Sequence, residues 1–577
     1  MIGGKQARLV RMLVQLRPHQ VGQRLRLHAY RAALDRQVPW LHQVLLSGPG
    51  PETAVAWPAA FTPLDARTWQ DCLDGHRLRR GELALLGLTR QVAPPGPDGA
   101  ARWERADWEM AGEPLLWRFH LYYWDWAWVL ATHFPPTEAR TMFASIWRSW
   151  HSAVVPGQGP AWLPYPAALR AWSFCSLYGH LAAGGPVEAP FRAELAAHAG
   201  FLRRNLETDV GGNHLIKNLK ALVGLAVFFA DNALLNGSMS RLDRQLAVQV
   251  LADGGHYERA PAYHCQVLAD LMDIAGLLRA AGRGVPTRLS EAIAAMCGWL
   301  GCVLTPAGTV PLLNDGFPVH PALLSQLAPA VPPAGPLHLL RDTGLARITV
   351  GWWHVLADMG PPCPPELPAH AHADTLSCVV HVDSEPLLIE TGTSTYAAGP
   401  VRDRERSTAA HNTVEVDRRD STEVWGTFRA GRRARVTEVS ARSDALGITV
   451  EAAHDGYRSL PGRPAHRRRW TVRADELRVE DEVTGEGRHR VTVRWHLAPK
   501  TGLRLVPGGA VVGTAAGEIE VAVTASSELA VTADTAPVAM GFGVTHPAPV
   551  LICDVHSELP VRIRTCWRRT GTRQEQT

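Results

Sequence analysis

The sequence predicts an all-α domain followed by an all-β domain. From Trp103 to about residue 330, apolar residues recur at three- and four-residue spacing, as in HLIKNLKALVGLAVFFADNALL, with short Gly/Pro turns between segments. Beyond residue 340 the period falls to two, as in RRRWTVRADELRVEDEV, which is typical of antiparallel strands. The stretch VPPAGPLHLL, residues 331–340, has the composition of a linker. A chain of 577 residues is long enough for at least two domains.

The first 40 residues are basic, with eight Lys/Arg against the single acid Asp35. Leucines and other apolar residues among these arginines predict one or two amphipathic helices. We expect them to pack on the main body with a solvated basic face; contact with a membrane surface or an anionic glycan is the alternative. The Pro- and Gly-rich residues 41–102 predict an irregular connector. The predicted parts are an N-terminal segment with its connector, a helical domain and a sandwich, at residues 1–102, 103–335 and 336–577.

Composition excludes several classes of protein. A net charge of +4 gives no reason to expect nucleic-acid binding, and no run of eighteen apolar residues predicts a membrane-spanning helix. Arginines interrupt the N-terminus every few residues, unlike a signal peptide, so we expect a cytoplasmic protein. The nine cysteines include no CxxC pair and are expected to be reduced core residues. The oligomeric state stays open, a homodimer included.

Residues 370–412 concentrate groups that can do chemistry. His370 and His372 flank one alanine, Asp374 follows, and His411 lies near the end of the stretch. In an extended segment residues i and i+2 face the same way, so both imidazoles can point into one site. Two short apolar runs, LSCVVHV and PLLIETG, are predicted strands. So much polarity beside two apolar strands predicts a functional site.

The helical domain carries three further polar clusters. Asn213 and His214 stand at the head of an apolar helix, where Asn213 has the alternative role of N-cap. A Gly-rich turn is crowded with ionisable groups, namely Asp253, His256, Glu258, Arg259, Tyr263 and His264. The third cluster comprises Trp162, Tyr165 and Arg170. Aromatic residues beside an arginine suit stacking on a sugar and pairing with a carboxylate, and they suit core packing equally well.

These stretches resemble the heparinase II/III family of polysaccharide lyases, which is related to alginate and oligo-alginate lyases. The matching segments follow the family's order from about Trp103 to His496, and they are GNHLIKNLKAL, DGGHYERAPAYH, LLNDG, AHAHADTLSCVVHVDSEPLLIETGTSTY and RSTAAHNTVEVDRRDSTEVWGTF. The resemblance implies an incomplete (α/α) toroid followed by an antiparallel β-sandwich; a bacterial protein is expected from the composition and N-terminus. That architecture agrees with the one that the periodicity predicts.

The resemblance also implies a reaction, β-elimination at a uronic acid of an acidic polysaccharide or oligosaccharide such as a glycosaminoglycan. This reaction needs a neutralised carboxylate, a base for the C5 proton and an acid for the O4 leaving group. By resemblance, Asn213 neutralises the carboxylate and His214 beside it is a candidate base. Tyr263 is the acid and also a candidate base. His370 completes the cleft from the sandwich side, where it helps to neutralise charge or acts as a base.

Arginines and a metal complete the expected site. A tyrosine titrates near 10, so a basic Tyr263 needs cationic neighbours, and the candidates, which also suit an acidic substrate, are Arg259 and Arg404 or Arg406. Some family members hold a metal in the sandwich, and the matching ligands are His372, Glu390 and His411. Zinc suits them, in a structural role, although a Glu stands where Asp is expected. Hydrogen-bonded scaffold residues are the alternative, and no organic cofactor is expected.

Two other functions stay open from the sequence. One is a non-catalytic or accessory heparinase-like protein in surface polysaccharide biosynthesis, of capsule or exopolysaccharide, which the absent signal peptide favours. The other is a glycoside hydrolase on an (α/α) toroid, which needs two carboxylates facing one bond. The acids Asp253, Glu258 and Asp315 form no obvious pair of this kind.

Overall fold

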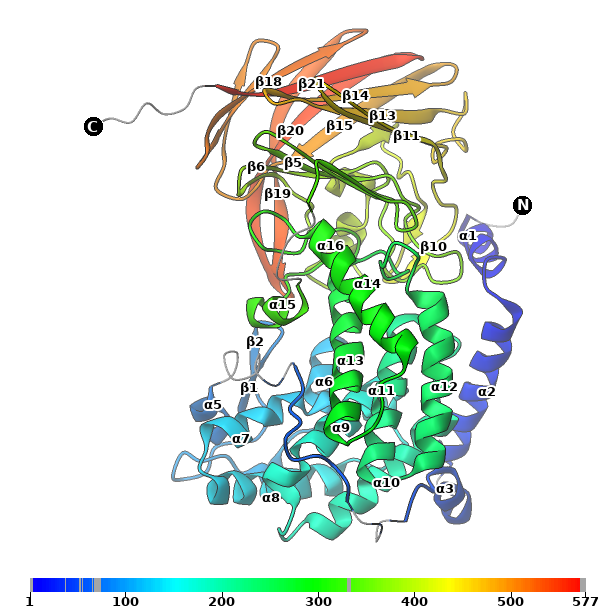
Figure 1. Ribbon diagram of the computed structural model, residues 1–577, viewed down its shortest axis with the longest axis vertical. Helices are drawn as coiled ribbons and strands as arrows, with labels where there is room; N and C mark the ends of the chain where they lie inside the picture. The colour runs from blue at the N-terminus through cyan, green and yellow to red at the C-terminus, as the bar shows by residue number, and fades with distance from the viewer. Residues whose placement is uncertain are drawn as a thin grey trace.

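The computed structural model confirms a helical domain followed by an antiparallel β domain (Figure 1). It describes residues 4–36, 38–50, 53, 55–64, 66, 74–328 and 334–570. The change from helix to strand falls between α15 (Pro321–Leu327) and β3 (Leu337–Leu340). Residues 329–333, which include the start of the predicted linker, lie outside the described residues.

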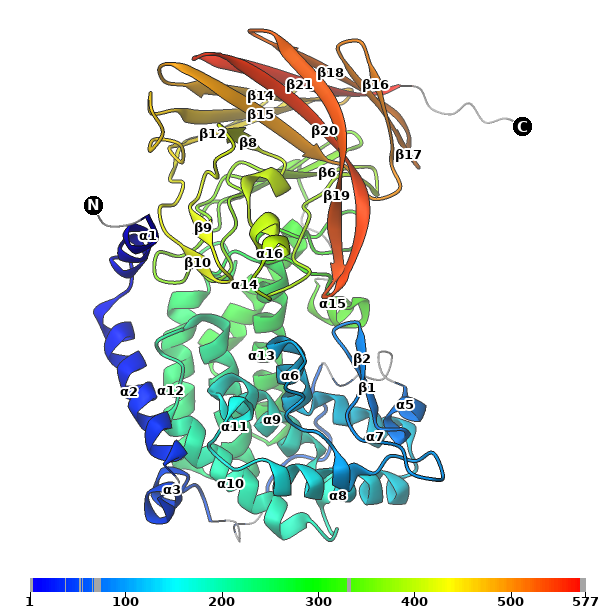
Figure 2. The same ribbon diagram turned by 180° about the vertical axis from the view of Figure 1, so that it is seen from behind.

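Three N-terminal helices run one after another along one edge of the molecule in both views (Figures 1 and 2), and they are α1 (Gly4–Leu13), α2 (Pro18–Asp35) and α3 (Pro39–Leu45). Helix α2 buries Gln20, Leu27 and Leu34, which are seven residues apart and therefore share a face. Arg11 donates to Glu423 at 2.6 Å, which ties α1 to the sandwich. The expectation that these helices pack on the main body is confirmed.

The predicted irregular connector contains regular structure, which corrects that prediction. A short helix, α5 (Gly75–Arg79), is followed by a hairpin of β1 (Glu82–Leu85) and β2 (Leu88–Gln91). The turn residues Leu86 and Gly87 both have positive φ, as a tight two-residue hairpin requires. Strands of four residues are too short to show a clear alternating pattern. The many Pro and Gly residues around them are typical of loops, so the composition did not indicate strands.

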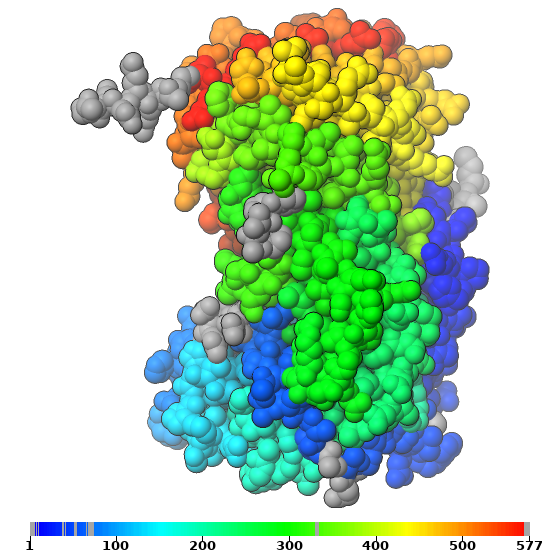
Figure 3. Space-filling view, in the orientation of Figure 1, coloured from blue at the N-terminus to red at the C-terminus, as the bar shows by residue number. Residues whose placement is uncertain are grey.

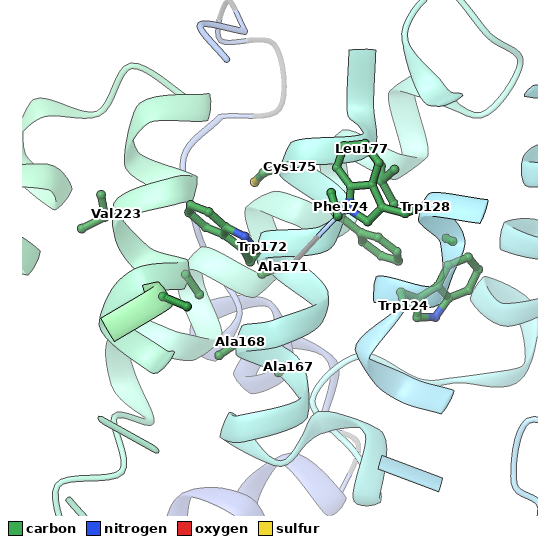
Figure 4. Packing of buried hydrophobic residues seen from close by; sticks show 14 of the residues in the cluster. Trp124, Trp128, Ala167, Ala168, Ala171, Trp172, Phe174, Cys175, Leu177 and Val223 are labelled. Carbon is green, nitrogen blue, oxygen red and sulfur yellow. The ribbon is translucent and has the colours of Figure 1, made fainter. Parts of the chain in front are cut away.

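The helical domain surrounds a dense apolar core, and its helices are α6 (Leu115–Tyr123), α7 (Trp128–His133), α8 (Pro136–Ala153), α9 (Pro164–Leu177), α10 (Glu188–Arg204), α11 (Gly212–Phe228), α12 (Asn232–Gln249), α13 (Pro261–Ala280), α14 (Thr287–Val303) and α15. Helices α9, α11 and α13 are buried on nearly all sides, as central helices must be. Helix α9 buries the small residues Ala167, Ala168 and Ala171 together with the large side chains of Trp172 and Phe174 (Figure 4).

The β domain consists of three larger antiparallel sheets and the small β9–β10 hairpin. The sheet nearest the helices has the order β3-β4-β5-β6-β7, a four-stranded sheet has the order β19-β20-β15-β8, and an eight-stranded sheet has the order β11-β12-β13-β14-β21-β18-β17-β16. The strands after β3 are β4 (Leu345–Val350), β5 (Trp353–Asp358), β6 (Cys378–Val382), β7 (Glu385–Leu388), β8 (Val414–Val416), β9 (Val424–Trp425), β10 (Arg429–Ala430), β11 (Val436–Asp444), β12 (Gly447–His454), β13 (Ala465–Val472), β14 (Glu476–Thr484), β15 (Arg488–His496), β16 (Gly502–Val506), β17 (Gly509–Thr514), β18 (Gly517–Ala525), β19 (Leu529–Gly541), β20 (Val544–Glu558) and β21 (Val561–Thr570).

The two domains share one apolar core across their junction. Leu340, Leu345, Leu356 and Val379 of the first sheet belong to the same buried cluster as the toroid residues. Thr343 adds polar contacts, since its backbone N–H and hydroxyl donate to the Asp253 carboxylate at 2.7 and 2.8 Å. The sheet is therefore fixed over the ends of α13 and α14, where the candidate residues of both domains lie. Within the described part of the chain, every helix is too short or too polar to cross a bilayer.

Candidate active site between the two domains

The start of α11 fixes the first candidate residue. Gly211 is the N-cap, so the alternative role of Asn213 as N-cap is wrong. The Asn213 side-chain amide instead donates to Glu258 at 2.9 Å, and its backbone N–H donates to the same carboxylate at 2.8 Å. Gly212 has φ +56°, and a Cβ there would lie 1.8 Å from a Glu258 oxygen. Only glycine allows Glu258 to approach α11 this closely.

His370, from the sandwich, lies between two carboxylates. Its Nδ1 is 2.9 Å from Asp315, and its Nε2 is 3.4 Å from Glu258. Each ring nitrogen therefore faces a carboxylate oxygen. Burial opposes ionisation of Glu258, but the charges of His370 and His256 and the hydrogen bonds from Asn213 lower its pKa. Asn213, Glu258 and His370 thus form one connected network across the domain interface.

Tyr263, at the start of α13, completes this centre. Its ring centre lies 3.9 Å from that of His370, and its hydroxyl is 2.6 Å from the hydroxyl of Tyr396. Burial raises the pKa of Tyr263 well above its ordinary value, and Tyr396 and Asp315 add to the effect. The expectation that arginines lower this pKa is therefore wrong. A phenol in this setting keeps its proton at neutral pH, which suits an acid and not a base.

His214 is the most accessible of the four predicted catalytic residues, with 36% of its side chain exposed. Its ring packs against that of Tyr165 with the ring centres 4.2 Å apart, and its Nδ1 is 3.2 Å from Glu207. Burial alone would lower the pKa of His214, but the carboxylates of Glu207, Glu258 and Asp209 together raise it. With Nδ1–H donating to Glu207, Nε2 carries the lone pair, as a general base requires.

Asp315 is the central acceptor of the site, a role that its sequence motif does not indicate. It is fully buried and accepts from His370, from His372 at 2.8 Å, and from both terminal nitrogens of Arg402. The segment around His370 and His372 is a loop and not a strand. Both imidazoles nevertheless reach the same carboxylate, as the prediction of a shared site requires. The motif LLNDG was visible in the sequence, but nothing there indicates its partners.

The three predicted arginines have other partners. Arg259 donates to the backbone carbonyl of Thr343, and Arg404 donates to that of Pro537 at 3.3 Å. Arg406 is buried and donates to backbone carbonyl groups, namely those of Ala371, Gly426 and Arg429. The arginine that enters the site is Arg402, through Asp315.

The aromatic cluster divides into a core part and a site part. Arg170 is fully buried, donates to the carbonyl of Ala161 at 2.8 Å, and stacks over Trp150 and Trp162 at 5.0 Å. Trp162 also packs on His198 at 4.3 Å. Core packing therefore accounts for Trp162 and Arg170, whereas Tyr165 joins the site through His214.

The predicted metal ligands lie near one another, with the ring centres of His372 and His411 5.3 Å apart, but each is hydrogen-bonded to another protein group. Glu390 accepts from Ser377 and lies against Nδ1 of His411, on the side of that ring away from its unpartnered Nε2. His372 is bound to Asp315. Among the described residues, no group of three or more His, Cys, Asp or Glu side chains is placed to hold a metal ion. The set does not fit a shared ion in this arrangement, so zinc binding stays a prediction and enters no step below.

Aromatic side chains cover the centre. Phe317 packs on Tyr263 at 5.6 Å, and Phe542, in the turn between β19 and β20, packs on Phe317 at 5.6 Å and on Tyr396 at 5.2 Å. Asn213, Tyr263 and His370 are only 2%, 8% and 7% exposed. A substrate that reaches them must displace part of this cover.

Comparisons with known proteins agree with the fold and the motif order. A family model described as heparinase II/III N-terminus matches residues 189–331, and one described as heparinase II/III-like, C-terminal, matches residues 332–565. A solved heparinase III structure aligns with a TM-score of 0.73 at 15% identity, covering 95% of this chain and 92% of that one. Heparan sulfate lyase HepC from Pedobacter heparinus aligns with a TM-score of 0.59 at 14% identity, covering 95% and 88%. At these identities the likeness concerns the fold.

One curated relative has a different kind of name. FtsZ-localized protein C from Caulobacter vibrioides (strain NA1000 / CB15N) is 29% identical over 286 residues. The match covers 46% of this chain and 49% of that protein, so the chain spans about half the length of the curated relative it matches.

Proposed function

The chain belongs to the heparinase II/III-like family, and from that premise we propose that it is a polysaccharide lyase, cleaving a uronic-acid-containing glycan by β-elimination between toroid and sandwich. One observation carries the proposal. Asn213 and Tyr263 from the toroid and His370 from the sandwich meet in one connected cluster, although 157 residues separate the first from the last (370 − 213). A purely structural interface needs no such set of amide, phenol and imidazole groups.

In this proposal, the Asn213–Glu258–His370 network stabilises the charge of the uronate carboxylate. Loss of the C5 proton moves charge onto the carboxyl group, and donors aimed at that group stabilise the transition state. Without substrate, Glu258 occupies the donors of Asn213 and faces His370. The substrate carboxylate would replace or share these contacts, so Glu258 acts as the positioning residue that holds both donors ready.

His214 and Tyr263 divide the proton transfers. His214 Nε2 takes the C5 proton, the C4=C5 double bond forms, and the C4–O4 bond breaks. The O4 oxygen then takes the proton of the Tyr263 hydroxyl. The hydrogen bond to Tyr396 provides a second phenol from which Tyr263 can be reprotonated. The raised pKa of Tyr263 suits the acid role, and the bond between His214 and Glu207 orients the base.

The proposal is tested by following the ultraviolet absorbance of unsaturated uronate while the purified protein is incubated with alginate, hyaluronan, chondroitin sulfate and heparan sulfate. We expect absorbance to rise with at least one of them, and the Tyr263→Phe variant to lose turnover while it keeps substrate binding. If the folded protein gives no unsaturated product from any of these glycans, the lyase proposal fails for them. Turnover by Tyr263→Phe would remove the tyrosine from its role.

The covered site favours a second candidate, a non-catalytic or accessory protein in surface polysaccharide biosynthesis. Asn213, Tyr263 and His370 are nearly inaccessible, and a relative is named for its localisation with FtsZ and not for a reaction. A cytoplasmic location, which the sequence predicts, is consistent with this second candidate function. It predicts that an oligouronide binds without turnover. The glycoside hydrolase alternative loses support, because Glu258 and Asp315 both face His370 and do not flank an open bond.

A further inference from the structure

The N-terminal helices carry a second apolar surface that faces outward. Of the 17 large hydrophobic side chains that are exposed in the described part of the chain, seven lie between Leu9 and Val44. Six of these form one i,i+4 pair on each helix, and these pairs are Leu9 with Leu13, Val21 with Leu25, and Trp40 with Val44. Residues four apart lie on the same helix face, so each helix presents a small apolar patch to solvent. We call the three pairs together the apolar strip.

Helix α2 shows that the strip is distinct from the packed face. Its buried residues Gln20, Leu27 and Leu34 define the inner side, and Val21 and Leu25 are 46% and 67% exposed on the other. A surface helix of a globular protein normally has one apolar stripe, which faces the core. Packing on the body of this protein therefore does not account for Val21 and Leu25.

Positive charge accompanies the strip. Residues 1–40 hold eight Lys/Arg and one acid, Asp35. Next to α2 lies the end of α10, where Arg26 donates to the backbone carbonyl of Arg204, and Arg203 and Arg204 donate to Ser47. These three guanidinium groups bind neutral oxygens, whereas four other arginines of the segment are paired with carboxylates of the main body, namely Arg8 and Arg11 with Glu423, Arg17 with Glu366, and Arg24 with Asp209. Figure 3 shows the dark-blue N-terminal residues along one edge of the molecule, open to solvent.

We propose that the apolar strip and its arginines form a docking surface for an anionic phospholipid bilayer. Apolar side chains interleaved with arginines on successive helices along one edge suit insertion at the headgroup boundary, and an exposed Trp such as Trp40 is favoured there. An anionic glycan would use the charge but not the outward leucines and valines. A second copy of the chain would bring two arginine-rich surfaces together, which like charge opposes.

This surface determines how the protein lies on the membrane. The three helices follow the long axis of the molecule (Figures 1 and 2), so docking places both domains side by side along the bilayer. The surface is separate from the centre around His370, and membrane docking therefore goes beyond the proposed lyase activity and is independent of it.

The test is flotation of the full-length protein with vesicles of phosphatidylcholine alone and with vesicles that also contain phosphatidylglycerol. We expect binding to the anionic vesicles and release at high salt, because the electrostatic part is screened. The Leu25→Ser/Trp40→Ser double variant should bind about tenfold or more weakly, since two apolar side chains no longer leave water. These positions are 67% and 66% exposed, so thermal unfolding should stay unchanged.

The matched control is Leu446→Ser/Leu505→Ser, which changes two apolar side chains that are 68% and 44% exposed on the sandwich. It should float with anionic vesicles as well as the unchanged protein does. Equal flotation with both kinds of vesicle, or no loss in the Leu25/Trp40 variant, would overturn the proposal. The proposal would also be overturned if neither the unchanged protein nor the Leu25/Trp40 variant bound vesicles, and light scattering showed a dimer for the unchanged protein but not for the variant.

Discussion

At the scale of single residues, Asp315 and His370 hold the candidate centre together. His370 comes from the loop before β6, and its two nitrogens face Asp315 and Glu258. Asp315 in turn binds Arg402 and His372. Each of these groups is buried, so each depends on its partners to offset the loss of water. Replacing one member should therefore affect the others.

The Asp315→Asn variant should be less stable by about 3–5 kcal/mol, because Arg402 loses its partner inside the protein. Burial opposes ionisation of Asp315, but Arg402 and the two imidazoles hold its pKa well below the ordinary value. Its contribution to stability is thus fully present above the unfolded pKa of about 4 and is lost as pH falls through the folded pKa. Urea unfolding at neutral and acid pH measures both effects. Equal stability of variant and parent at neutral pH would contradict the network.

The pH dependence of turnover reports on His214. As a base it must be neutral, so the rate should rise with pH through the pKa of His214, which lies above its ordinary value. The Glu207→Gln variant removes the nearest of the charges that raise this pKa, and the rising limb should move to lower pH. A profile that does not shift in Glu207→Gln would exclude His214 as the base. The measurement is kcat/KM against pH for both proteins.

The sequence predicted the catalytic candidates better than their partners. Asn213, Tyr263 and His370 stand in recognisable motifs, and they do meet. The sequence did not indicate the roles of Asp315, Arg402 and Tyr396, because these roles depend on contacts between distant segments. Asp315 and Arg402, for example, are 87 residues apart in the chain. The choice of Arg404 or Arg406 over Arg402 shows the same limit, since three arginines in one short helical stretch look alike until the fold orients them.

At the scale of elements, the α11 start is the most constrained feature of the site. The Gly212→Ala variant should lose about 2–4 kcal/mol of stability, because its φ is left-handed and the new Cβ would collide with Glu258. Turnover should fall as well, since Glu258 positions Asn213 and His370. The control is Gly298→Ala in α14, where a Cβ meets nothing within 4 Å and a gain of about 0.5–1 kcal/mol is expected. Thermal unfolding that ranks the two variants the other way would contradict this account.

Helices and long strands were predictable because their periods are sustained over many residues. The change of period near residue 335 falls where helix α15 gives way to strand β3. The β1–β2 hairpin and the loop around His370 were not predictable, because short segments carry too few residues to show a period. In that loop the two imidazoles converge through hydrogen bonds to Asp315 and not through strand geometry.

At the scale of the whole molecule, the two domains behave as one body at their junction. Their apolar residues form a continuous cluster, and Thr343 links the first sheet to Asp253 and Trp299. Calorimetry should therefore show a single unfolding transition, with no separate melting of the sandwich. Two well-separated transitions would mean that the junction contributes little to stability.

The most direct measurement of the central claim is a crystal structure of the Tyr263→Phe variant with a bound oligouronide. We expect the uronate carboxylate to contact Asn213 and His370. We also expect C5 to lie beside His214 Nε2 and O4 to lie beside the missing hydroxyl of residue 263. An oligouronide bound elsewhere on the protein, with Asn213, Glu258 and His370 still bonded to one another, would contradict this claim.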